Sequence, residues 1–135
     1  MSIKLITPPT VEILSLAEAK LALRKETDEE DALIATLISA ARLKAEHATG
    51  RAFGQQTREL IIDAFPEDEI LLPGTPVTSI VSVRYADIAG ATQTLDPSAY
   101  VLDGDYVPSC LIPAFGVAWP DTYDTANAVR VQYVC

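Results

Sequence analysis

Apolar residues between positions 31 and 50 recur at steps of three and four. This spacing gathers them into one stripe along an α-helix. Gly50 follows directly, where glycine can end a helix in the left-handed conformation without a steric penalty. About 20 residues with a rise of 1.5 Å each form a rod of roughly 30 Å. We therefore predict one long amphipathic helix with a packing or subunit-contact stripe. The stripe comprises Leu33, Ile34, Leu37, Ile38, Ala41, Ala45 and Ala48.

A shorter helix is predicted ahead of the long one. Ser15 precedes Leu16-Ala17-Glu18, so the Ser15 hydroxyl and the Glu18 carboxylate can each accept a bond from a free backbone N–H in a capping box. The helix then runs from Leu16 to about Leu23. One short helix cannot cover the whole stripe of the long helix, so we expect self-association to cover the remainder.

Four consecutive acids, residues 28–31, separate the two predicted helices. A metal site needs oxygen ligands that converge on one point, often around a loop with glycine. Consecutive acids in a helix instead fan around its axis. We therefore predict that Asp28 is the N-cap of the long helix and that the next acids face the positive end of its dipole. No metal-binding residue is predicted, because His47 is the only histidine and cannot form such a site alone.

The pattern changes near residue 54, after which short β-prone runs alternate with Gly and Pro. Strands are predicted at about residues 56–63, 70–72, 77–85, 92–95, 100–102, 110–112 and 128–134, with a hairpin turn around Gly90. Two runs show clear alternation, one through Val77, Val81, Val83 and Tyr85 and one through Val129, Val131 and Tyr133. The chain is thus predicted to be a single α+β domain (1–135), with a helical part (1–53) followed by an antiparallel β-rich part with loops (54–135).

Charge and composition narrow the classes of function. Ten basic and nineteen acidic residues give a formal charge of −9. This balance argues against a sequence-independent nucleic-acid binder, which neutralises phosphates with Lys and Arg. No window approaches about 20 consecutive apolar residues, so no membrane span is predicted. Cys110 and Cys135 lack zinc-ligand spacing; we favour free buried thiols in a reducing cytoplasm and leave a disulfide open.

Candidates for catalysis are few. The sequence contains no G-x-S-x-G, P-loop or G-x-G-x-x-G motif, and no spacing pairs a nucleophile with a base. We predict no catalytic residue and no cofactor. A hydrolase that uses scattered carboxylates stays open as a minor alternative.

An aromatic segment, AFGVAWPDTY, concentrates unusual residues near the C-terminus. Phe115, Trp119 and Tyr123 can pin this segment to the core, or they can contact a protein partner, for which Trp and Tyr are enriched. A third interpretation is a ligand platform. On that basis the alternative function is a small carbohydrate- or peptide-binding module built around Trp119.

The order of these signals resembles the head–tail connector (adaptor) family of long-tailed bacteriophages and of related prophage or gene-transfer particles. The resemblance rests on LITPPT, SLAEAKLALR, DEEDALIATLISAARLKAEHATGRAF, QTRELIIDAFP, ILLPGTPVTSIVSVRYADIAGATQTLDPSAYVLD, AFGVAWP and NAVRVQYV. No single piece is specific, but their order extends over nearly the whole chain.

The resemblance implies a structural virion protein and no enzyme. Such proteins form a homo-oligomeric ring, commonly of twelve subunits, in the neck below the portal protein. The ring extends the DNA channel without sequence-specific DNA binding, and it docks a tail, stopper or terminator protein. Assembly in the host cytoplasm is implied. Members often continue beyond the strand matching NAVRVQYV into another helix, so we expect a neighbouring subunit to complete the helical core or that core to be smaller.

Overall fold

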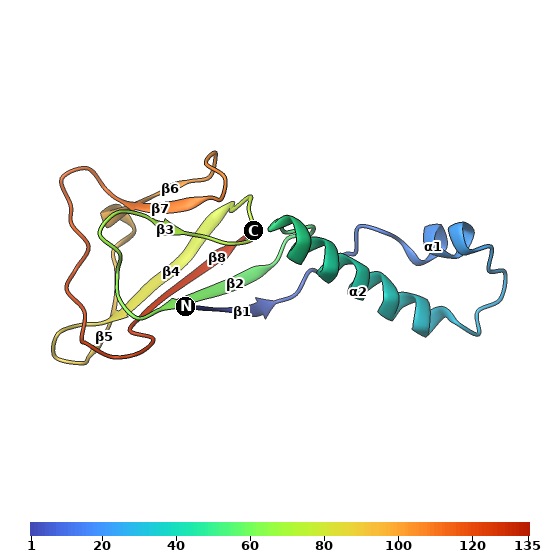
Figure 1. Ribbon diagram of the computed structural model, residues 1–135, viewed down its shortest axis with the longest axis horizontal. Coiled ribbons are helices and arrows are strands. Elements are labelled where there is room, and N and C mark those ends of the chain that lie inside the picture. Colours follow the sequence, from blue (N-terminus) through green and yellow to red (C-terminus); the bar gives the residue numbers. More distant parts are fainter.

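The computed structural model describes residues 1–135 and has helices first and most strands after them, which confirms the predicted α+β class. The helices are α1 (Leu16–Leu23) and α2 (Asp31–Thr49). The strands are β1 (Ser2–Thr7), β2 (Thr57–Ile62), β3 (Ile70–Leu71), β4 (Ser79–Ala86), β5 (Thr92–Thr94), β6 (Tyr100–Asp103), β7 (Cys110–Pro113) and β8 (Val129–Val134), with a short 3₁₀ turn at Pro97–Ala99. In Figure 1 both helices extend away from one end of the β part as an arm.

Two antiparallel sheets form the β part. Their strand orders are β1-β2-β8-β4-β5 and β3-β7-β6. Leu60, Val131 and Val83 pair across three neighbouring strands of the larger sheet and share one core cluster with Ile70 and Leu111 of the smaller sheet. The sheets therefore pack inner face to inner face as a small sandwich, as amphipathic strands do.

The alternation in the last strand is confirmed. Val129, Val131 and Tyr133 are fully buried, while Arg130 and Gln132 between them are partly exposed. The hydroxyl of Tyr133 donates a hydrogen bond to the carbonyl of Pro73 at 2.7 Å, so its one polar atom has a partner inside the core. β8 is the central strand of the larger sheet, and its pattern follows from this position.

The alternation predicted for residues 77–85 is wrong at Val81. Val77 and Val83 are buried, but the Val81 side chain is 53% exposed. The β4–β8 register shifts between Ile80 and Ser82. A bulge of this kind inserts one residue into a strand and reverses the side on which the preceding side chains lie.

Strand β1 was not predicted. It pairs antiparallel with β2, from Ser2 opposite Ile61 to Thr7 opposite Thr57. Every residue of β1 is exposed, so its sequence has no buried face to create an alternating pattern. Its partner residues lie 50 to 59 positions away along the chain, and only the tertiary fold brings the two strands together.

The start of α1 is as predicted. The Glu18 N–H donates to the Ser15 hydroxyl at 3.2 Å, and the Ser15 N–H donates to the Glu18 carboxylate at 2.9 Å. The end of α2 is also as predicted, because Gly50 has a φ of 68° and its N–H bonds to the Glu46 carbonyl.

The prediction that Asp28 caps α2 is wrong. The helix begins at Asp31, and Glu30 stands at the N-cap position without a side-chain hydrogen bond to the helix. The Asp28 carboxylate lies 2.6 Å from the ammonium of Lys20, on α1. The same ammonium lies 2.7 Å from the Asp31 carboxylate. Asp28 therefore forms an ion pair with α1 and does not cap α2, because the turn between the two helices brings Lys20 close to Asp28 and Asp31.

Candidate assembly surfaces

Helix α2 has two apolar lines where the sequence predicted one stripe. Ile34 and Ile38 are buried, whereas Leu33 and Leu37 are 57% and 54% exposed. In the remainder of the predicted stripe, Ala41 and Ala48 are exposed and Ala45 is half-buried. At 100° per residue, Leu33 and Leu37 lie about 100° around the helix from their buried neighbours. We call Leu33, Leu37 and Ala41 the outer ridge of α2.

Helix α1 covers only a small part of α2. Ala19, Ile34 and Ile38 form a separate cluster of three buried residues, with Leu16 packed against it. Other large apolar side chains of the arm remain exposed, among them Leu21 at 81% and Leu23 at 55%. Because α1 and the start of α2 stand clear of the sandwich (Figure 1), neither sheet covers them. Several exposed large apolar side chains on one element are typical of a protein–protein contact.

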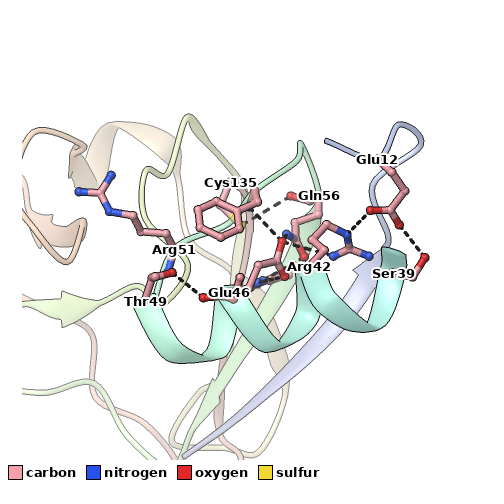
Figure 2. A network of polar contacts seen from close by, with 11 residues as sticks. Glu12, Ser39, Arg42, Glu46, Thr49, Arg51, Gln56 and Cys135 are labelled. Atoms are coloured by element: carbon pink, nitrogen blue, oxygen red, sulfur yellow. Dashed lines mark hydrogen bonds and ion pairs between the residues drawn. The ribbon is translucent and has the colours of Figure 1, made fainter. Parts of the chain in front are cut away.

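A polar network joins the arm to the sandwich (Figure 2). Its centre is Glu46, which is 5% exposed. The Glu46 carboxylate accepts hydrogen bonds from the Phe53 N–H at 2.9 Å and from the Gln56 amide at 2.8 Å. It lies 3.3 Å from both the Arg42 and the Arg58 guanidinium groups. The Glu46 carboxylate therefore connects helix α2, the loop that follows it and strand β2.

The same network holds the linker between β1 and α1. The Glu12 carboxylate accepts from Arg42 at 2.8 Å and from the Ser39 hydroxyl at 2.7 Å. The Arg42 hydrogen bond, with help from Ser39, lowers the pKa of Glu12 below its ordinary value. Burial raises the pKa of Glu46, but the bonds from Phe53, Gln56 and Arg42 outweigh burial and lower it overall. Both groups are thus stabilised in their charged forms.

Sequence reasoning missed this network. Arg42 and Glu46 continue the four-residue steps of Ile34 and Ile38, and all four residues are buried. A charged pair that extends a buried apolar line was the available signal, because buried charges need partners. The partners themselves, Glu12 and Arg58, lie 30 and 12 positions away and follow no pattern.

The three aromatic side chains of the segment AFGVAWPDTY lie in different environments. The Trp119 ring stacks on Phe65 with a centroid distance of 4.9 Å and an interplanar angle of 7°, and the indole N–H donates to the Asp68 carbonyl at 2.9 Å. Trp119 thus pins its loop to the sandwich. Phe115 is fully exposed and Tyr123 is 50% exposed, so these two side chains are available for partner contact.

Other kinds of site find little support in the geometry. No three His, Cys, Asp or Glu side chains gather as a metal site requires. Cys110 and Cys135 are both buried and free. Neither helix has the length and apolar character needed to cross a bilayer. The surfaces that stand out are therefore those suited to protein contacts.

Comparison with known proteins identifies the family. A family model described as phage gp6-like head–tail connector protein matches residues 13–93. The match spans more than half of the chain and includes α1, α2 and the strands β2, β3 and β4. The chain belongs to the phage gp6-like head–tail connector family. No curated protein sequence matches it.

Solved structures similar to this connector come from gene transfer agent (GTA) particles. One is the neck of an empty GTA particle computed with C6 symmetry, with a TM-score of 0.80 and 25% identity over 100% of this chain and 71% of that chain. Another is the virion of a native GTA particle, with a TM-score of 0.73 and 26% identity over 100% and 71% of the two chains. A third, the neck of a native GTA particle computed with C12 symmetry, has a TM-score of 0.65 at 23% identity and shows the shared fold alone. This connector chain is thus a structural protein of phage-like particles.

Proposed function

We propose that this connector assembles as a ring in the neck of a phage-like particle, between portal and tail, and that it lets DNA pass through its centre. The observation that carries the proposal is the projecting arm, whose outer ridge has no partner within the chain. Similarity to a chain from a neck computed with C6 symmetry supports the ring. The formal charge of −9 supports free passage of DNA, because an acidic wall withholds phosphate contacts.

The arm also supports a specific packing of the ring. A cyclic ring of more than two subunits uses a heterologous contact, in which one surface patch of a subunit meets a different patch of its neighbour. The outer ridge offers leucines and a small residue at four-residue steps, which suits close packing of a second helix. The neighbour's arm, with its exposed Leu21, has the matching chemistry.

Two experiments test the proposal. Cryo-electron microscopy of particles that carry this chain should show it in the neck as a closed ring. A particle whose neck lacks the chain would contradict the proposal.

A matched pair of variants tests the outer ridge. Leu37 and Leu43 lie on the same helix with exposures of 54% and 51%, but on different sides of it. We expect Leu37→Glu to abolish incorporation into particles and Leu43→Glu to leave it near wild type. Equal incorporation of both variants would exclude the outer ridge as a subunit contact.

A further inference from the structure

The two outer faces of the sandwich carry opposite charge. On the larger sheet, Arg84 and Arg130 stand directly opposite each other on β4 and β8. Like charges in such a cross-strand pair repel. Glu59 on β2 relieves the repulsion, because its carboxylate oxygens lie 3.1 Å from Arg84 and 3.3 Å from Arg130. Lys4 pairs with Glu59 across β1 and β2, so it shares this face. We call Lys4, Glu59, Arg84 and Arg130 the basic face.

The basic face differs from the other ion-paired groups of the chain in its ratio of basic to acidic residues. Six of the ten basic residues form ion pairs. Only in the group around Glu59 do bases outnumber acids, with two arginines on one carboxylate. The Arg84 and Arg130 side chains remain 45% and 41% exposed. Each guanidinium has five N–H donors but makes only one ion-pair contact, with Glu59. The face can therefore bind further carboxylates.

The smaller sheet presents the complementary charge on its outer side. Asp103, Cys110 and Leu71 are cross-strand neighbours and lie on the side away from the core residues Leu102, Leu111 and Ile70. Glu69 directly precedes β3 and is exposed. The pKa of the Cys110 thiol is raised, first by burial and then by the negative charges of Asp103 and Glu69. Asp105 follows in the next turn, and residues 85–129 contain six aspartates and no Lys or Arg. We call Glu69, Asp103 and Asp105 the acidic face.

We propose that the basic face of one copy docks on the acidic face of the next copy around the ring. This inference rests on the proposed ring and assigns a second contact between its subunits, in addition to the contact through the arm. Opposite faces of a two-layer sandwich point in opposite directions, which is the arrangement that a heterologous ring contact requires. A second copy fits better than DNA phosphates, because each copy brings its own complementary face and the chain as a whole is acidic.

Structure determination of the neck tests this contact directly. We expect ion pairs between Arg84 or Arg130 of one copy and Glu69, Asp103 or Asp105 of the adjacent copy. A ring in which the basic face meets solvent, DNA or another protein would overturn the inference and leave the ring itself intact. A neck without this chain would overturn both.

Charge exchange gives an independent test. We compare Lys4→Glu/Arg84→Glu, which leaves Glu59 paired with Arg130, with Glu69→Lys/Asp105→Lys, which leaves the turn bonds of Asp103 in place. Each double variant should reduce the number of copies per particle at least tenfold. The combination of all four changes restores both the complementarity and the wild-type formal charge, so we expect it to restore incorporation.

A control separates local charge from net charge. Arg51→Glu makes the same change in net charge as Arg84→Glu alone, at an exposed arginine that forms no ion pair and lies outside both helices of the arm. We expect normal incorporation of Arg51→Glu and a loss for Arg84→Glu. Thermal unfolding of every variant confirms that it is folded. Loss in Arg51→Glu equal to that in Arg84→Glu, or failure of the four-fold combination to recover, would refute the contact.

Discussion

Replacing Glu46 by alanine tests whether the polar network fixes the arm to the sandwich. The change removes the acceptor for two hydrogen bonds, from Phe53 and Gln56, and leaves two guanidinium groups without this carboxylate. Arg42 keeps Glu12 as a partner, but Arg58 loses its only carboxylate. Removing one member of a buried ion pair costs about 3–5 kcal/mol when the remaining charge is left without a partner. We therefore expect Glu46→Ala to lower the free energy of unfolding by about 3–5 kcal/mol. For a domain with a total of about 5–15 kcal/mol, that is a large fraction.

Urea unfolding measures this loss with two probes. Trp119 is the only tryptophan and reports on the sandwich, while far-ultraviolet circular dichroism reports mainly on the helices. The control is Glu29→Ala, an exposed acid of the same arm that forms no ion pair, and it should leave the midpoint unchanged. A loss below about 1 kcal/mol for Glu46→Ala, the level of an ordinary substitution, would refute the stabilising role of the network.

The same residue predicts a dependence on pH. The pKa of Glu46 is held below its ordinary value of 4.5, so the folded protein binds its proton less readily than the unfolded chain. The stabilisation is complete above pH 4.5 and is lost as the pH falls through the lowered pKa. Glu46→Gln should remove this contribution to acid sensitivity. An unchanged stability-against-pH curve below pH 4.5 would contradict the assignment.

Four further expectations concern single positions. Ser15→Ala should cost about 1 kcal/mol in thermal unfolding through loss of the capping box, and Asp28→Ala should cost less than Ser15→Ala, because Asp28 caps nothing. Leu111→Ala should cost about 2–5 kcal/mol, since the side chain is fully buried in the core. Trp119→Ala should lower the melting temperature clearly and Phe115→Ala should not, because only Trp119 packs on the sandwich; equal shifts would show that the stacking on Phe65 contributes nothing. Added Mg²⁺ or Ca²⁺ should leave the melting temperature unchanged, and a rise that Asp28→Ala abolishes would restore a metal role for the acidic run.

The sequence by itself determined the elements whose signals are local. The capping box at Ser15, the glycine that ends α2 and the alternation through Val129, Val131 and Tyr133 all depend on neighbours within a few positions. These signals were sufficient for the helix boundaries of α1, for most strands and for the α+β class. The family resemblance was likewise readable from the order of the segments, and the match over residues 13–93 confirms it.

Only the tertiary structure decided which side of each element is buried and which charges meet. Leu33 and Ile34 are adjacent and equally apolar, yet the direction in which α1 packs buries one and exposes the other. The sequence predicted Asp28 as a helix cap, but in the folded protein Asp28 lies beside Lys20 and pairs with it. The Glu46 network and the two charged faces of the sandwich join residues from distant segments, because sheet pairing and layer packing act through space and leave no periodic trace along the chain.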